Sequence, residues 1–301
     1  MMGRTHALTG AMVFGLAASA VESVAHLTAG ELLLGTAVCA GAAVLPDIDH
    51  PGSGISRTLG PLTQGFALLV AWTSGGHRNG THSLAGVAVF TLLAFAAAGL
   101  HAGSPLWLIA GLGLAVVLGL VGFVTATVEP PGRGRGRPAY RERWHGVASA
   151  WIGAGVAVGL AVAALLFPHR TGLALLALLL VLVLSATARI VSTRRLLGLK
   201  REWDDVLPVP ITAVLVLGGA DLRVVPVAVA LGVIVHIAGD MVTLGGCPLG
   251  WPWSQTMRGP RLFRTNSGVE HRLVFPACTA VLGGTVAWNS GLITALSTRG
   301  A

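Results

Sequence analysis

Residues 79–128 read NGTHSLAGVAVFTLLAFAAAGLHAGSPLWLIAGLGLAVVLGLVGFVTATV and contain no Asp, Glu, Lys or Arg. About 20 apolar residues cross the hydrocarbon core of a bilayer, so this stretch predicts two transmembrane helices, over 82–102 and 104–127. Further runs without these charged residues extend over 144–169 and 273–298. The recurrence of such runs predicts a polytopic membrane protein.

The composition of the whole chain agrees with this interpretation. Of its 301 residues, 53% are hydrophobic and 11% are charged, whereas roughly 25% are charged in soluble domains. These values exclude a disordered chain, a collagen-like chain and an ordinary cytosolic enzyme. We therefore predict an all-α transmembrane helical bundle of about nine or ten spans, forming a single integral membrane domain over 1–301. The other expected spans are 5–26, 29–46, 145–167, 171–192, 207–221, 223–243 and 273–294.

Two segments leave alternatives open. The apolar run 59–75 contains Gly60 and Pro61, so it could cross the bilayer, re-enter it or lie at its interface. The N-terminal run ends in Ala18-Ser19-Ala20, which could also be a signal-peptide cleavage site. His6 interrupts that run and apolar residues continue beyond it, which favours a first membrane helix.

The net charge is +8, and Lys200 is the only lysine among 20 basic residues other than histidine. Nucleic-acid binding is not expected, because the arginines lie in short loops between apolar runs, as the positive-inside rule describes. The loops 128–144, 193–206 and 244–272 are separated by pairs of spans, so they share the cytoplasmic side. The helix at 82–102 begins on that side too. If 59–75 does not cross, Asp47, Asp49 and His6 also lie there.

The chain has three cysteines and no Cys-x-x-Cys pattern, so no disulfide framework is expected. Cys39 and Cys278 lie in apolar runs and are expected to pack as small hydrophobic residues.

Ionisable residues gather at the ends of the predicted spans, where they are costly and mark candidate functional sites. Four clusters stand out, and the topology above places them on one side of the membrane. They are Arg4-Thr5-His6, Leu45-Pro46-Asp47-Ile48-Asp49-His50, His77-Arg78-Asn79-Gly80-Thr81-His82-Ser83 and His236-Ile237-Ala238-Gly239-Asp240.

The residue types in these clusters predict a metal site. His236 and Asp240 are four residues apart and face the same way on a helix. Imidazole and carboxylate groups suit a divalent metal, with zinc first and manganese or iron as alternatives. Each residue taken singly could be an ordinary polar group at a helix end, but their convergence favours shared ligation. The predicted ligands are His6, Asp47, His77, His82, His236 and Asp240.

The number of candidate groups exceeds what one four-coordinate ion needs. A two-metal site, or one metal with surrounding positioning groups, is therefore expected. We predict Asp49 as the general base or a ligand of a second metal. Arg78, next to a ligand, could stabilise an oxyanion or hold a phosphate.

At these motifs the chain resembles the LexA-regulated, membrane-bound, metal-dependent hydrolases of bacterial inner membranes. Beyond the four clusters, the resemblance includes Thr243-Leu244-Gly245-Gly246-Cys247-Pro248-Leu249-Gly250-Trp251-Pro252. The motif-bearing parts are 1–90 and 230–272, and 100–222 matches only as generic spans. The family pattern has glycine where this chain has Asn79. The resemblance implies hydrolysis at a metal centre.

A phosphoester or a lipid headgroup at the cytoplasmic face is the expected substrate, with the lipid bilayer as partner. The arginine- and tryptophan-containing loop 244–272 could be a lid over the site or a membrane anchor. Two other function classes remain open, a transporter and a non-catalytic membrane protein with a structural metal.

Overall fold

The computed structural model describes residues 1–21, 26–127, 155, 158–159, 161–191 and 203–289 of the chain. Most of the predicted span 145–167 and the arginine-bearing stretch 128–144 lie outside these residues, as do 193–202. The helices run in the order α1 (Gly3–Val21), α2 (Ala29–Ala42), α3 (Pro61–Thr73), α4 (Leu84–Ala102), α5 (Leu106–Thr127), α7 (Pro168–Val191), α9 (Trp203–Val206), α10 (Pro208–Leu217), α11 (Val224–Val242) and α12 (Phe275–Asn289).

Short irregular turns join these helices at the places that carry the polar motifs. Three are 3-10 turns, η1 (Leu45–Asp49), η2 (Ile55–Arg57) and η3 (Gly80–His82), and one is a π-helical turn, η4 (Glu270–Val274). Within the described residues there is no strand beyond two isolated bridges, Thr243 with Phe263 and Cys247 with Arg258.

The all-α, multi-pass class predicted from the sequence is confirmed. Five segments are long and apolar enough to cross a bilayer. They are Ala29–Asp49, Leu84–Ala102, Leu106–Thr125, Pro168–Val191 and Val224–Val242. The total of nine or ten spans stays a prediction, because the described residues include only part of 145–167.

The segment at 59–75 does not cross the membrane as a helix. It forms α3, which has 13 residues and so a length of about 20 Å, against a hydrocarbon core of about 30 Å. Gly60 precedes it with φ 61°, a left-handed conformation in which glycine needs no strain. The predicted span at 207–221 is likewise shorter, because α10 ends at Leu217 after 10 residues.

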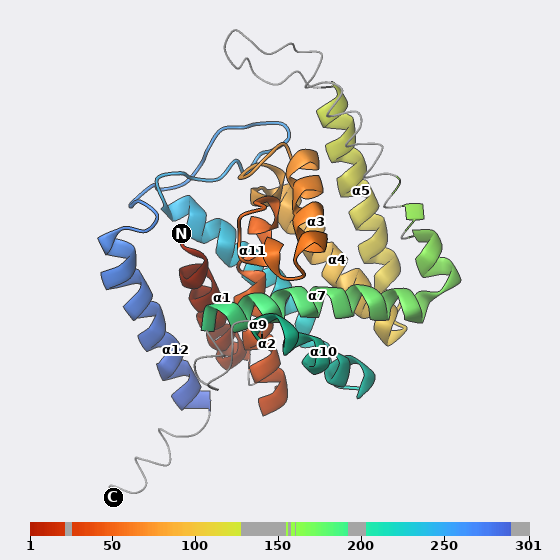
Figure 1. Cartoon of the computed structure of the whole chain (residues 1–301), viewed down its shortest axis with the longest axis horizontal. Helices are drawn as coiled ribbons and strands as arrows, with labels where there is room; N and C mark the ends of the chain where they lie inside the picture. Colours follow the sequence, from red (N-terminus) through yellow and green to blue (C-terminus); the bar gives the residue numbers. More distant parts are fainter. Residues whose placement is uncertain (22–25, 128–154, 156–157, 160, 192–202, 290–301) are drawn as a thin grey trace, which may run out of the picture.

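Helices α1, α2 and α11 pack together at the centre, with α4 and α7 beside them. In Figure 1, α12 lies along one edge next to α1, and α5 lies along the opposite edge next to α4. The core contains fully buried residues such as Val38, Val229 and Val233. Leu33, Ile109 and Val214 are 74%, 71% and 72% exposed on the outside, where lipid tails would cover them.

Two glycines bring three helix backbones into contact. A Cβ on Gly10 of α1 would lie 2.7 Å from the carbonyl oxygen of Cys39 in α2, and one on Gly232 of α11 would lie 2.6 Å from the same oxygen. Such close approach through small residues is typical of membrane helices. It brings the ends of α1, α2 and α11 to one place.

Candidate metal centre

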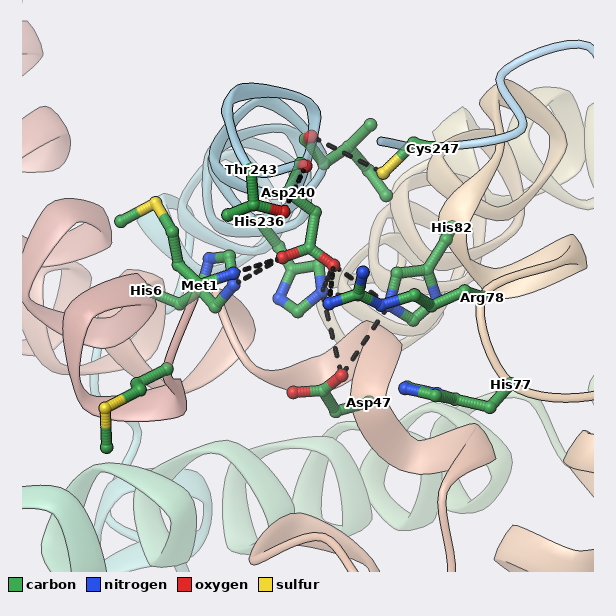
Figure 2. Close-up of polar contacts among 12 residues, drawn as sticks. Met1, His6, Asp47, His77, Arg78, His82, His236, Asp240, Thr243 and Cys247 are labelled. Carbon is green, nitrogen blue, oxygen red and sulfur yellow. Dashed lines mark hydrogen bonds and ion pairs between the residues drawn. The ribbon is translucent and has the colours of Figure 1, made fainter. Parts of the chain in front are cut away.

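The four polar clusters meet at one end of this helix group (Figure 2). Helix α2 stops at Ala42, and Pro46 follows within the turn η1, which carries Asp47 and Asp49. His82 ends η3 just before α4, and His236 and Asp240 occupy the last turns of α11. His6 comes from the first turns of α1.

Two histidine nitrogens lie between two carboxylates, and we call the four residues, His82, His236, Asp47 and Asp240, the ligand tetrad. His82 Nε2 lies 3.1 Å from His236 Nε2. These nitrogens lie 3.6 and 3.8 Å from Asp47 Oδ1, and 3.8 and 3.9 Å from Asp240 Oδ2. Bonds of about 2.0–2.1 Å to a tetrahedral zinc ion place neighbouring ligand atoms roughly 3.3 Å apart. Each histidine nitrogen is therefore spaced from the other nitrogen and from the two carboxylates as in a slightly expanded metal shell.

The hydrogen bonds behind the two histidines assign their tautomers. His236 Nδ1 donates to the carbonyl oxygen of Ala43 at 2.8 Å. The Thr81 hydroxyl donates to Asp49 Oδ2, so His82 Nδ1, 2.9 Å away, donates to that hydroxyl. In the neutral rings both Nε2 atoms then carry lone pairs and face each other, which is unfavourable without a proton or a cation between them. Metal-bound histidines are usually oriented in this way by a carbonyl or carboxylate.

Asp49 lies behind the histidines. Its side chain is fully buried. It accepts from His77 Nδ1 at 2.7 Å and from the backbone N–H of Arg78 at 3.2 Å, in addition to the Thr81 hydroxyl. His82 Nδ1 lies 3.4 Å from its Oδ2 atom. This placement favours a positioning role, and the roles as general base or second-metal ligand stay predictions from the sequence.

His6 contacts Oδ1, the second carboxylate oxygen of Asp240. Its Nε2 atom lies 3.1 Å from Asp240 Oδ1, and its ring stacks on His236 with centroids 4.1 Å apart. The ammonium group of Met1 contacts the same oxygen. Nδ1 of His6 is buried without a hydrogen-bond partner in the described part of the chain. His6, His236 and Asp240 form one of two groups whose donor atoms lie close enough to share an ion.

The second such group is Asp47, His77 and His82. Because Nδ1 of His77 is bonded to Asp49, its Nε2 atom is the one available for an ion. The side chain of His77 is 38% exposed and that of Asp47 is 26% exposed, whereas His82, His236 and Asp240 are buried. The cluster therefore opens to the surface along Asp47 and His77.

Arg78 reaches into the cluster from this open side. Its Nη2 atom lies 3.3 Å from Asp240 Oδ2, and its side chain is 27% exposed. Its backbone has φ 62°, a conformation that residues other than glycine seldom adopt. The following residue, Asn79, has φ −115° and donates from its amide to the carbonyl oxygen of Gly75. Asn79 thus takes the place of the family's glycine with its side-chain amide bonded within this turn.

The negative charge of the cluster favours the binding of cations. Three buried or half-buried carboxylates, those of Asp47, Asp49 and Asp240, lie around His82. Burial disfavours the protonated form of His82, but the nearby carboxylates of Asp47 and Asp49 outweigh this and raise its pKa to about 9. The protein thus places positive charge where an ion would bind.

The structure brings together every site residue predicted from the sequence, and it gives a place in the site to three residues whose roles the sequence did not assign. The Thr81 hydroxyl and the Ala43 carbonyl orient the two histidines of the tetrad. Glu270 is fully buried and accepts from the backbone N–H groups of Met2 and Asn266, which keep its pKa below the ordinary value although burial opposes this. It thereby fixes the segment that precedes His6.

The contacts of Thr81, Ala43 and Glu270 could not be predicted from the spacing of residues in the sequence. Thr81 has the sequence signature of a helix cap, a backbone carbonyl has no signature at all, and Glu270 belongs to no motif. Cys247 lies near the site, but burial raises the pKa of its thiol to about 12, and its Sγ atom is directed at the carbonyl oxygen of Ile237. All three cysteines are buried, and for Cys39 and Cys278 this agrees with the packing predicted from their apolar runs.

The position of the tetrad also answers the topological question left open by 59–75. Asp47 and His82 flank that segment in the chain, and their side chains are 3.6 Å apart. They therefore lie on the same side of the membrane, which agrees with the shortness of α3.

The helices and the polar cluster define a multi-pass membrane protein with a buried group of histidines and aspartates able to hold a metal ion. The family model for the YdjM inner membrane protein matches residues 1–196 and, in a second overlapping match, 169–298. The chain belongs to this family. No curated protein and no solved structure matches it.

Proposed function

We propose that this chain is a metal-dependent hydrolase of the bacterial inner membrane that acts on a phosphoester or lipid headgroup at the cytoplasmic face. One observation carries the proposal. Two imidazole Nε2 atoms whose Nδ1 atoms are already engaged meet at 3.1 Å, between two carboxylates from distant parts of the chain. Such an arrangement needs a proton or a cation between the two nitrogens, and its two carboxylates make it well suited to a metal ion.

The donor set fits a divalent ion. His82, His236, Asp47 and Asp240 would hold it, and His6 and His77 would either complete the shell or bind a second ion. Two imidazoles with two carboxylates suit zinc, with manganese and iron as alternatives. An ion bound there supplies Lewis-acid polarisation and makes water a competent nucleophile near neutral pH.

The residues at the open edge have the chemistry to bind an anionic substrate. The guanidinium of Arg78 presents paired donors beside the tetrad, and such a planar fork matches phosphate oxygens. Its ion pair with Asp240 would be exchanged for the substrate once a metal neutralises that carboxylate. Arg78 would then bind the substrate and stabilise negative charge that develops on it.

The cytoplasmic orientation rests on charge. The segment that follows α11 lies next to the tetrad and carries Arg258, Arg261 and Arg264 without any Asp or Glu from Met241 to Val269. Positive residues in short loops remain on the cytoplasmic side. The site would then face the inner leaflet, where phospholipid headgroups are within reach.

A structural metal site is closed on all sides, whereas this cluster is open along Asp47 and His77. That difference favours catalysis over a purely structural ion.

The test is purification in detergent, measurement of bound metal, and assays of phosphodiester and phospholipid hydrolysis. Wild-type protein should bind a divalent metal and hydrolyse at least one substrate of this class. His236→Ala and Asp47→Ala should lose both the metal and the activity. The matched control Asp221→Ala changes an exposed acid at the start of α11, the opposite end from Asp240, and should keep both.

Metal without turnover on any substrate would favour the structural alternative. Normal metal content in both tetrad variants would refute the site.

A further inference from the structure

The segment after α11 carries a second feature that the metal cluster does not use. It turns back and returns along the end of α11, where it crosses one end of the helix group (Figure 1). Leu244 N–H donates to the carbonyl oxygen of Phe263 at 2.8 Å, and Leu262 N–H donates to that of Val242 at 2.7 Å. Cys247 and Arg258 exchange two backbone hydrogen bonds, at 3.0 and 2.8 Å. The returning backbone is therefore fixed in place.

The inner edge of this segment is a wall of the candidate site. A Cβ on Gly245 would lie 2.2 Å from Nη1 of Arg78, and Trp251 is buried against Gly80. The carbonyl oxygen of Leu249 accepts from the N–H of Leu84 at the start of α4. The segment is therefore attached to the elements that carry the ligands.

The outer edge has a different character. Trp253, Met257 and Leu262 are 57%, 37% and 72% exposed. Arg258, Arg261 and Arg264 are exposed among them, and Glu270, the first acid that follows, is buried. We call these six residues, Trp253, Met257, Arg258, Arg261, Leu262 and Arg264, the Trp–Arg surface.

We propose that the Trp–Arg surface is a binding site for anionic phospholipids of the leaflet that the metal cluster faces. The segment begins at the end of a membrane-spanning helix, so it lies at headgroup depth. Tryptophan favours that depth, with its ring among the acyl chains and its N–H in the headgroup layer. Arginines without acidic neighbours attract anionic lipid.

The combination selects lipid over other partners. Three exposed guanidinium groups match phosphate, and the exposed apolar side chains between them would be unfavourable in water but stable in the acyl region. Because the inner edge of the same segment borders Arg78, anionic headgroups would be concentrated beside the open side of the cluster. The binding itself requires neither a metal nor turnover.

The test uses the full-length protein in phosphatidylcholine nanodiscs in which about 20% of the lipid is brominated, as either phosphatidylglycerol or phosphatidylcholine. This share of labelled lipid suffices because one basic residue near a surface changes the occupancy by anionic lipid roughly fivefold. Bromine quenches nearby tryptophan fluorescence. The contribution of Trp253 is the difference between wild type and Trp253→Phe.

We expect the brominated anionic lipid to quench Trp253 more strongly than the brominated neutral lipid. The difference should disappear in the triple variant Arg258→Gln, Arg261→Gln, Arg264→Gln, and it should shrink in wild type as salt is raised, because exposed charges are screened. The salt series needs no variant, so it stands even if the triple variant does not fold.

Arg170→Gln is the matched control. It removes an exposed arginine at the start of α7, which packs near the end of α4 that lies away from His82. It should keep the preference for anionic lipid. Equal quenching by the two lipids in wild type would refute the charge recognition. Quenching by neither lipid would refute the membrane contact and would favour a water-exposed or protein-covered surface. A preference that survives both high salt and the triple variant would also refute the proposal.

Discussion

Asp49→Asn tests whether the metal centre depends on the group behind its histidines. The aspartate accepts hydrogen bonds on both oxygens, from His77, from Thr81 and from the backbone N–H of Arg78. Asparagine has nearly the same shape but only one acceptor oxygen, and its amide donors would face donors on the other side. At least one of the two rings, His77 or His82, then loses its orienting partner.

The size of the effect follows from this loss. Removing the partner of a metal-bound histidine costs about 10- to 100-fold in metal affinity, or roughly 1.4–2.8 kcal/mol. We therefore expect zinc to bind Asp49→Asn more weakly by that factor, but still measurably, while Asp47→Asn loses most of its affinity because a ligand is gone. Competition with a chromogenic chelator in detergent measures both, and Asp221→Asn is the control that should bind as wild type does.

Three results would separate the roles of Asp49. Wild-type affinity in Asp49→Asn would refute the positioning argument. A loss as large as that of Asp47→Asn would make Asp49 a direct ligand. Unchanged zinc affinity together with loss of hydrolysis would support the sequence-based prediction that Asp49 is the general base.

Other variants and conditions test further parts of the structure. Arg78→Gln should keep the bound metal and lose hydrolysis of phosphodiesters, because the guanidinium serves the substrate; loss of metal in this variant would contradict that division. Gly41→Ala should lower the melting temperature in detergent by an amount equivalent to about 1–3 kcal/mol, because its Cβ would lie 1.9 Å from the carbonyl oxygen of Val183. Gly111→Ala, which has open space around it, should be neutral or slightly stabilising, and equal effects of the two variants would be unexpected. In the metal-free protein the pKa of His82 is about 9, above the value of about 6.5 in the unfolded chain. The contribution of protonated His82 to stability is therefore complete below the unfolded pKa and is lost as the pH rises through about 9. Zinc must displace the His82 proton, so the zinc affinity should rise with pH over the same interval. Melting curves of the metal-free protein and chelator titrations at several pH values measure these two opposite trends. Zinc binding that does not depend on pH would contradict the prediction.

The fold class and the gathering of polar residues could be predicted because each depends on a local signal. Uncharged runs the length of a span indicate membrane helices, and His236 with Asp240 on one helix face indicates a shared target. The sequence predicts Asp47 as a ligand and Asp49 as a general base or second-metal ligand, and both lie on η1, a 3-10 turn with about three residues per turn. Residues two apart on such a turn point in different directions, so Asp47 faces the tetrad and Asp49 faces the back of His77.

Other features depend on contacts that no sequence pattern records. The shortness of α3 depends on where Gly60 and Pro61 allow a helix to begin. The orientation of His236 depends on the carbonyl oxygen of Ala43, which α2 leaves free where it ends. These are properties of two helices in contact, and they appear only once the helices are packed.

The glycine contacts of Cys39 with α1 and α11 have a mechanical consequence. Because backbone touches backbone, these three helices cannot slide past one another without collision, and the donor atoms at their ends keep their spacing. When the surrounding bilayer becomes thicker or thinner, we expect the group to tilt as one body rather than to shear. Ion coordination would then be insensitive to the acyl-chain length of the host membrane.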